Sequence, residues 1–161
     1  MRRGVAAVAG CVAATLLLTG CAAVDLPLAA VFKDADGEPE VLLRPCGDDS
    51  YRGPSLEGQA DGGRASEGTT GWQAKGTRSG EARFPLFSPP AAWSPRHRGE
   101  QRLLPLHTYT LSFGHYVTGD SYNGVVTFAA EDVATLGADE VWADGRAMSL
   151  GEFEGLAEDS C

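Results

Sequence analysis

Cysteine thiols are the side chains with the best-defined chemistry in this sequence, and they occupy positions 11, 21, 46 and 161. Cys21 follows the small residues Thr19-Gly20 and a 14-residue stretch without charge, residues 5–18. A thiol at that position can form a thioether with a diacylglycerol, and the small residues before it give a peptidase access to the preceding peptide bond. The thiol of Cys21 is therefore a candidate for covalent modification.

The segment before Cys21 has the parts of a secretory signal peptide. Arg2-Arg3 forms a short basic region, and Leu18-Thr19-Gly20-Cys21 resembles the lipobox of bacterial lipoproteins. This resemblance implies that residues 1–20 are removed, that Cys21 carries a covalent lipid and that residues 21–27 form a lipidated tether. We expect no cofactor besides this lipid. Each buried methylene of an acyl chain contributes about 0.8 kcal/mol, so two or more chains hold a protein on a bilayer. The expected location is the outer face of the cytoplasmic membrane.

An uncleaved transmembrane anchor is the alternative, because no charged residue occurs from position 4 to position 24 and about 20 apolar residues can span a bilayer. Glycines and alanines dilute this stretch, however, and the cysteine lies where a lipobox requires it. Both interpretations place the remainder of the chain outside the cytoplasm.

The remainder of the chain has the size of one acidic domain. Removal of 20 of the 161 residues leaves 141, and we expect a single β-rich extracytoplasmic domain over residues 28–161. Loss of two arginines changes the formal charge from −9 to −11. Such a charge disfavours nucleic acid as a partner and predicts repulsion from anionic lipid headgroups. Two lysines against eleven arginines, with no isoleucine, indicate a GC-rich and therefore actinobacterial genome.

Two cysteines, Cys46 and Cys161, remain after cleavage and lipidation. A single pair in an oxidising compartment favours a disulfide, which would tie the last residue to the end of an early strand. A redox-active pair is the functional alternative, but the sequence has neither Cys-x-x-Cys spacing nor a βαβ pattern around these residues. We therefore predict a structural disulfide.

Metal and nucleophile chemistry find little support in the sequence. His107 and His115 fall on the same face of a predicted strand, but eight residues of strand separate them by about 26 Å, too far to bind one ion. His97 lies between two arginines, which disfavours a cation. No Gly-x-Ser-x-Gly motif occurs, and adjacent acids such as Glu131-Asp132 are usually solvated. We expect no metal site and no catalytic residues, and a hydrolase assembled from distant residues stays an alternative.

A proline-rich segment is the best candidate for contact with a partner. It combines aromatic and basic side chains on a rigid backbone, which suits recognition of another protein by an otherwise acidic domain. The alternative is that its tryptophan closes the edge of the fold and its arginines are solvated. The candidate residues are Phe87, Pro89, Pro90, Trp93, Arg96, His97 and Arg98.

Short apolar runs and turn residues predict the elements that would position these side chains. Residues 106–115 alternate with a period of two, as in a half-buried strand. The glycine-rich residues 53–71 predict a mobile loop. Acidic residues at 34–40 superficially resemble a calcium loop, but the Asp-Gly pair between two apolar runs indicates a hairpin turn. Strands are expected at residues 28–33, 41–46, 69–75, 82–87, 106–115, 125–128 and 140–143.

The C-terminal residues predict a helix. Ser149 and Glu152 have the spacing of a capping box, and residues 130–136 suit one or two earlier helical turns. The expected buried stripe is Leu150, Phe153, Leu156 and Ala157. With about seven short strands, the predicted fold is mainly β, an antiparallel β-sandwich (immunoglobulin-like or related) with a C-terminal helix.

Three stretches of the sequence resemble a known group of proteins. Glu40–Cys46, Pro89–Trp93 and the tail from Val126 to Cys161 are similar to those of small actinobacterial (Streptomyces-type) lipoproteins with a lipobox signal peptide. Those proteins often have glycine before the tryptophan, where this chain has Ala92. The group has no established activity, so the resemblance implies an address and an architecture but no catalytic residue.

The function favoured by these observations is a membrane-anchored, non-enzymatic module of the cell envelope that binds a protein partner or acts as an adaptor. A lipoprotein that binds a small molecule or a cell-wall glycan is the second hypothesis, and a hydrolase is the third. A closed convex sandwich would favour the first, and a deep pocket lined by tryptophan the second. Partly buried clustered carboxylates, or a Ser-His pair in a cleft, would favour the third.

Overall fold

The computed structural model describes residues 22–62 and 69–161. Cys21 and the predicted signal peptide lie outside these residues. The described chain contains two α-helices, α1 (Ala130–Ala134) and α2 (Leu150–Ser160), and a 3₁₀ turn, η1 (Ala91–Trp93). The strands are β1 (Val24–Leu26), β2 (Ala29–Lys33), β3 (Pro39–Leu43), β4 (Ser50–Ala60), β5 (Thr70–Gln73), β6 (Thr77–Ser79), β7 (Ala82–Pro85), β8 (Arg96–Arg98), β9 (His107–His115), β10 (Tyr122–Ala129), β11 (Glu140–Ala143) and β12 (Arg146–Ser149).

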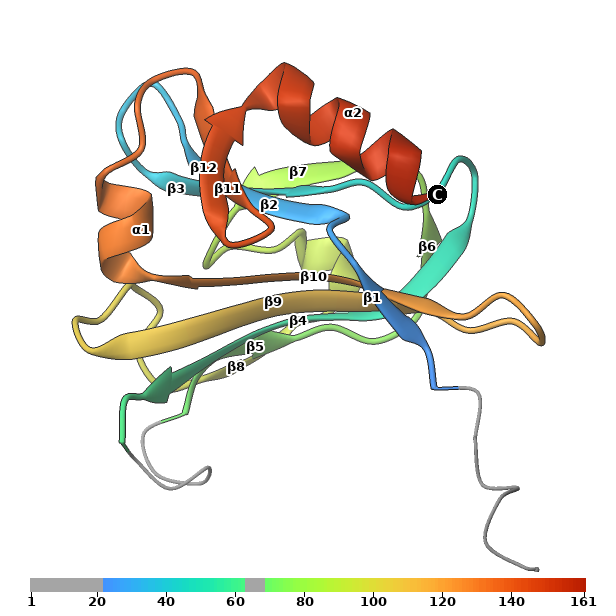
Figure 1. Ribbon diagram of the computed structural model, residues 1–161. Coiled ribbons are helices and arrows are strands. Elements are labelled where there is room, and N and C mark those ends of the chain that lie inside the picture. The colour runs from blue at the N-terminus through green and yellow to red at the C-terminus, as the bar shows by residue number, and fades with distance from the viewer. Residues whose placement is uncertain (1–21, 63–68) are drawn as a thin grey trace, which may run out of the picture.

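These strands form two sheets that lie over one another (Figure 1). The seven-stranded sheet has the order β1-β10-β9-β4-β5-β8, with β6 also paired to β4. The five-stranded sheet has the order β12-β11-β2-β3-β7. The predictions of a mainly β fold and a C-terminal helix are confirmed. The prediction of purely antiparallel sheets is wrong, because β1 pairs with β10 in parallel.

The main core lies between the two sheets. Alternation within β9 directs Tyr109, Leu111 and Phe113 inward, where each is at most 2 % exposed. Val31 and Val41 from the five-stranded sheet are fully buried in the same cluster. The period-two prediction is therefore confirmed for residues 107–115, whereas Leu106 lies outside the strand and is 73 % exposed.

A second, smaller core lies between the outer face of the five-stranded sheet and α2, which covers that face in Figure 1. Ala30 and Leu42 point to this side, since they alternate with the inward residues of β2 and β3. Phe153 from α2 is fully buried against them. The five-stranded sheet is thus buried on both faces, which explains its near-continuous apolar strands.

Capping and a disulfide hold α2 in place. The Ser149 Oγ accepts the Glu152 N–H at 3.2 Å, and the Glu152 carboxylate accepts the Ser149 N–H at 2.8 Å, so the predicted capping box is confirmed. The predicted disulfide is also present: Cys46 and Cys161 are bonded with their Cα atoms 5.5 Å apart. One part of the predicted stripe is wrong, because Leu150 is 42 % exposed.

Several local predictions were wrong for the same reason, namely that strand pairing overrides a weak local pattern. Residues 53–60 were expected in a mobile loop, yet they belong to β4, which pairs with β9 and β5. Residues 77–79 and 96–98 were not among the expected strands, and they form β6 and β8. Residues 140–143 were expected to be the last strand, but β12 follows them.

The N-terminal described residues join the sheet directly. Residues 24–26 of the predicted tether form β1, and the Val24 N–H donates to the Ser121 carbonyl at 3.4 Å. Among the described residues no helix is long and apolar enough to cross a bilayer.

Candidate functional site

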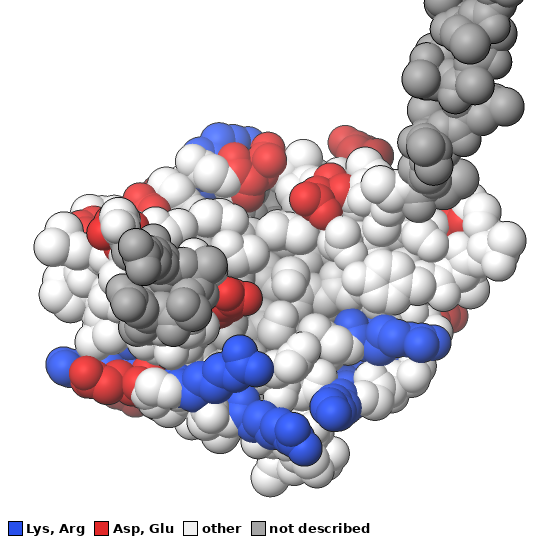
Figure 2. All heavy atoms as spheres, turned by 90° about the horizontal axis from the view of Figure 1, so that it is seen from below, with Lys and Arg blue, Asp and Glu red and all other residues white. Residues whose placement is uncertain are grey.

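The outer face of the seven-stranded sheet is open and polar. It is the face turned to the viewer in Figure 2, and no helix of the described chain lies over it in Figure 1. Hydroxyl groups meet across neighbouring strands: Ser55 and Ser112 oxygens lie 3.4 Å apart, as do those of Thr110 and Thr127. Because directly paired residues point to the same side of a sheet, these pairs mark one continuous hydroxyl-bearing surface.

Cations gather along one side of this face, although the chain as a whole is acidic (Figure 2). Arg96 and Arg98 of β8 pair with Gln73 and Gly71, which places both guanidinium groups on the outer side. Arg52 and Lys75 line a hollow at the same surface. We call these four residues, Arg52, Lys75, Arg96 and Arg98, the basic strip.

The basic strip is unneutralised within the described chain. In residues 22–62 and 69–161, no carboxylate lies within ion-pair distance of any of its four cations. Elsewhere three arginines are paired with carboxylates: Arg44 contacts Glu81 at 2.6 Å, Arg83 contacts Glu40 at 2.7 Å, and Arg102 contacts Glu100 at 2.7 Å. Exposed cations without internal partners are free to meet carboxylates or phosphates of another molecule.

Two of the hollows on this face are lined by residues of the basic strip. One, of about 490 Å³, is lined by Arg52 and Lys75 together with Tyr116 and Asn123. The other, of about 230 Å³, has Arg98 at its rim and Gly71 in its lining. A side chain at Gly71 is impossible, because a Cβ there would meet the Leu56 carbonyl oxygen at 2.0 Å. The larger hollow is open, so it suits contact with a partner's surface better than enclosure of a small ligand.

The predicted proline-rich candidate does not form one surface. Its aromatic part packs into the fold: the Trp93 ring lies 5.0 Å from that of Phe84, and the Arg78 guanidinium lies 4.5 Å from the Trp93 ring centre. Phe87 packs against Tyr109 at 6.2 Å.

The remaining residues of that candidate separate into two groups. Pro89 is buried and Pro90 half-buried, so they belong with the packed aromatic residues. Of the basic residues, Arg96 and Arg98 reach the outer face. His97 lies opposite the inward-facing Trp72 in the strand register, and its Nδ1 is hydrogen-bonded to Gln101 Oε1 at 2.9 Å. The structure therefore brings together the two arginines and separates them from the tryptophan.

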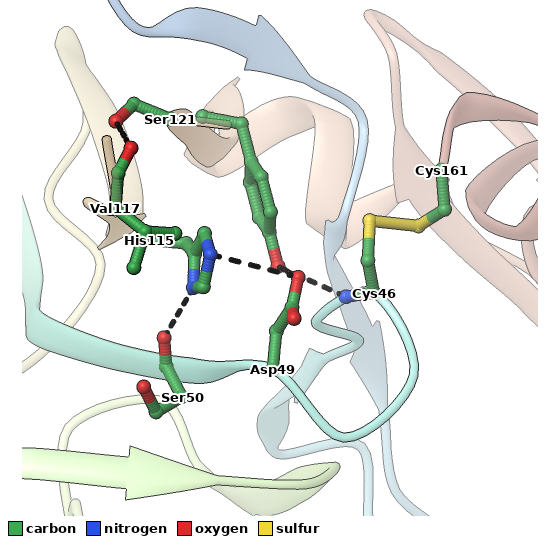
Figure 3. Close-up of polar contacts among 8 residues, drawn as sticks. Cys46, Asp49, Ser50, His115, Val117, Ser121 and Cys161 are labelled. Atoms are coloured by element: carbon green, nitrogen blue, oxygen red, sulfur yellow. Dashed lines mark hydrogen bonds and ion pairs between the residues drawn. A yellow bond between two sulfur atoms is a disulfide. The ribbon is translucent and has the colours of Figure 1, made fainter. Parts of the chain in front are cut away.

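His115 belongs to a buried polar cluster at one end of the seven-stranded sheet (Figure 3). It is 5 % exposed, and its Nδ1 lies 2.6 Å from the Ser50 backbone carbonyl, while Nε2 lies 3.9 Å from an Asp49 oxygen. Its ring stacks on that of Tyr122, with centroids 5.0 Å apart. The histidine contacts a backbone oxygen of Ser50 and not its hydroxyl, so this arrangement does not activate a nucleophile.

Tyr122 links this cluster to the disulfide. Its hydroxyl accepts the Cys46 N–H at 3.0 Å and donates to Asp49 Oδ2 at 3.1 Å. Burial, with the nearby Asp49 charge, raises the pKa of the Tyr122 phenol to about 12. The cluster is best explained as a structural network that joins β10 to the Cys46 loop.

A second, more apolar groove lies beside α2. It has a volume of about 490 Å³, and Phe32, Leu42 and Val141 supply its apolar lining. The Arg83 guanidinium lies 4.5 Å from the Phe32 ring centre at this groove. No tryptophan lines it. Across the described residues no group of three or more His, Cys, Asp or Glu side chains is placed to hold a metal ion.

Sequence reasoning missed half of the basic strip. Arg52 begins a segment rich in glycine, whose strand character was hidden because glycine favours loops. Its alternation of Leu56 inward with Ser55 and Glu57 outward is nevertheless the period-two signal of a half-buried strand.

Comparison with known proteins finds no homologue: no family model matches the chain, and no curated protein or solved structure is significantly similar to it.

Proposed function

We propose that this protein is a membrane-anchored extracytoplasmic lipoprotein that acts as a non-enzymatic binding or adaptor module of the cell envelope. A partner protein with an acidic surface binds the outer face of the seven-stranded sheet. The observation that carries this proposal is the basic strip, an exposed set of unneutralised cations on an open polar face of an acidic chain.

The anchoring part of the proposal is supported by the sequence alone. Leu18-Thr19-Gly20-Cys21 resembles a lipobox, and Cys21 is followed by Ala22 at the start of the described chain. The proposed location is the outer face of the cytoplasmic membrane. The resemblance to small actinobacterial lipoproteins supports this address, and the two-layered β fold is compatible with the proposed immunoglobulin-like or related class.

Charge complementarity explains why an acidic partner suits this face. Two acidic proteins repel each other at long range, but attraction between cations and carboxylates offsets this repulsion where the basic strip meets the partner. This local attraction also determines the orientation in which the two proteins bind. Exposed ion pairs are screened at high salt, since the Debye length falls to about 3 Å at 1 M ionic strength. Binding through the basic strip must therefore weaken steeply as salt rises.

The test uses the mature protein in detergent with a fluorescent poly-glutamate peptide as the acidic probe. Arg98→Glu reverses one charge of the basic strip, and Arg146→Glu is the matched control, since Arg146 is an exposed residue of β12 in the other sheet. We expect fluorescence anisotropy to show salt-sensitive binding that Arg98→Glu weakens several-fold and Arg146→Glu leaves nearly unchanged. Equal effects of the two reversals would exclude the basic strip as the binding surface.

A small-molecule or cell-wall glycan ligand is the second candidate, favoured by the groove beside α2 and its apolar lining from Phe32, Leu42 and Val141. A substitution that blocks this groove distinguishes ligand binding there from partner binding at the basic strip. Leu150→Trp adds bulk at its exposed rim residue and leaves the basic strip untouched. Loss of binding to cell-wall material in Leu150→Trp, with poly-glutamate binding intact, would favour the glycan hypothesis.

A further inference from the structure

The end of the seven-stranded sheet at which β1 begins carries three exposed apolar or amphipathic side chains. Val24, Tyr116 and Val117 are 57 %, 54 % and 49 % exposed. Val24 lies opposite Tyr122, the first residue of β10, so it is adjacent to the turn that joins β9 to β10. We call residues 116–121 the β9–β10 turn; in Figure 1 it projects beyond the other loops at this end.

Tyr116 is held in its exposed position by specific contacts. Its hydroxyl donates to Asn123 Oδ1 at 2.8 Å, and the Asn123 amide donates to Asp25 Oδ1 of β1 at 2.9 Å. The ring lies over Gly114, where a Cβ would come within 2.2 Å of it. An exposed aromatic ring fixed in this way is a preformed contact surface, because little side-chain entropy is left to lose.

Hydrogen bonds within the β9–β10 turn and at its first strand also fix its conformation. The Ser121 hydroxyl donates to the Val117 carbonyl at 2.9 Å, closing the turn, as Figure 3 shows. The residue before the turn, His115, is hydrogen-bonded to the Ser50 carbonyl, close to the Cys46–Cys161 disulfide. The turn can therefore contact a surface without a change in the conformation of the sheet.

The length of chain before β1 identifies that surface. Val24 follows Cys21 by three residues, and a fully extended chain reaches about 3.3–3.6 Å per residue, so roughly 11 Å separates them at most. Because β1 is paired to β10, this short segment cannot let the domain move far from a lipid on Cys21. A bilayer that holds a lipid on Cys21 therefore lies within about 11 Å of Val24, the residue of β1 adjacent to the β9–β10 turn.

We infer that the β9–β10 turn is a membrane-contact element, in which Tyr116 and Val117 enter the headgroup region of the bilayer that holds the lipid of Cys21. This inference rests on the proposed lipidation. Tyrosine is enriched at membrane–water interfaces because it has an apolar ring and a polar tip. Arg52 and Lys75 line the hollow beside Tyr116 and offer cations to lipid phosphates, while the acidic remainder of the domain is repelled.

This contact also orients the domain. The strands of the seven-stranded sheet run away from the turn, so Arg98, which lies opposite Gly71 on the outer face, stays clear of the membrane. Arg96 and Arg98 of the basic strip therefore remain available to a partner while Arg52 and Lys75 face the membrane.

The test places a fluorophore at the turn of the lipidated mature protein in phosphatidylcholine vesicles. Val117→Cys introduces one free thiol, because Cys46 and Cys161 form a disulfide and Cys21 carries the lipid in this proposal. Leu106→Cys is the matched control: Leu106 is 73 % exposed and directly precedes β9, at the opposite end of the strand. An environment-sensitive dye on each thiol is then quenched with spin-labelled lipids.

We expect the dye at position 117 to shift its emission to the blue and to be quenched several-fold more than the dye at position 106. Equal quenching in protein that floats with the vesicles would overturn the membrane contact and leave the lipid anchor intact. Protein that does not float, with an intact mass lacking acyl groups, would overturn both the proposed lipidation and this inference.

Discussion

The two outer faces of this sandwich differ in what covers them. The five-stranded sheet is covered by α2, whose Phe153 is fully buried against Leu42 and Val141. The seven-stranded sheet has an outer face of hydroxyl, amide and charged side chains, Glu57 among them, with Ser55 and Ser112 in contact across β4 and β9. The first face is used for stability, and the second is available for recognition.

This difference follows from the strands themselves. Buried strands with apolar residues on both sides, such as β2 and β3, need a cover, and α2 supplies it. Strands that alternate apolar and polar residues, such as β9, remain stable with one face in water. Substitutions on the covered face should therefore change stability, whereas substitutions on the open face should change binding.

The largest expected effect comes from removing the covalent bond that holds α2. The disulfide closes a loop with a sequence separation of 115 residues, for which the chain-entropy model gives an upper estimate of about 5 kcal/mol. We expect Cys46→Ser combined with Cys161→Ser to lower the free energy of unfolding by about 3–5 kcal/mol, measured by urea denaturation. A loss similar to that of one surface substitution would show that packing alone holds α2.

Phe153→Ala should come next, because it leaves a cavity between α2 and the five-stranded sheet. Burial of the full ring predicts a loss of about 3–4 kcal/mol in the free energy of unfolding. Leu150→Ala on the same helix is the control, since Leu150 is 42 % exposed, and it should cost under about 1 kcal/mol. Similar losses for both variants would contradict the assignment of the covered face.

Tyr122→Phe should have an intermediate effect, since it removes the link between the open sheet and the disulfide loop. Loss of the partner of the Cys46 N–H predicts a cost of about 1–2 kcal/mol.

The pH dependence of stability gives this substitution a distinct signature. The folded pKa of Tyr122, about 12, lies above the ordinary value of 10.0. The resulting stabilisation is fully present below pH 10 and is lost as the pH rises toward 12. Between pH 10 and pH 12, the free energy of unfolding should decrease more steeply for the native sequence than for Tyr122→Phe, as measured by urea denaturation at each pH. The same pH dependence for both proteins would exclude this role of the phenol.

The smallest effect on stability is expected on the open face. Arg98→Ala removes an exposed cation without an internal carboxylate partner and should change the free energy of unfolding by less than about 0.5 kcal/mol. The same variant should weaken the salt-sensitive binding of poly-glutamate by a measurable factor. A stability loss above 1 kcal/mol in thermal or urea unfolding would mean that the basic strip is a structural element.

The sequence by itself determined the elements whose signals are local. The alternation of residues 107–115, the hairpin around Asp34–Glu38 and the Ser149–Glu152 capping box depend on spacing along the chain, and all three are present. The Cys46–Cys161 bond also followed from the sequence, once the other two cysteines had been assigned to the signal peptide and the lipid.

Only the tertiary structure decided which strands share a sheet and which side chains share a face. Strand β8 has no local signal, and it exists because β5 offers an edge to residues 96–98. Arg98 and Trp93 are five residues apart along the chain, but that pairing places the arginine beside Gly71 while the tryptophan ring packs on Phe84. Long-range hydrogen bonding and burial select among conformations that local spacing does not distinguish, and they assembled the basic strip from three separate parts of the chain: β4, the residues after β5, and β8.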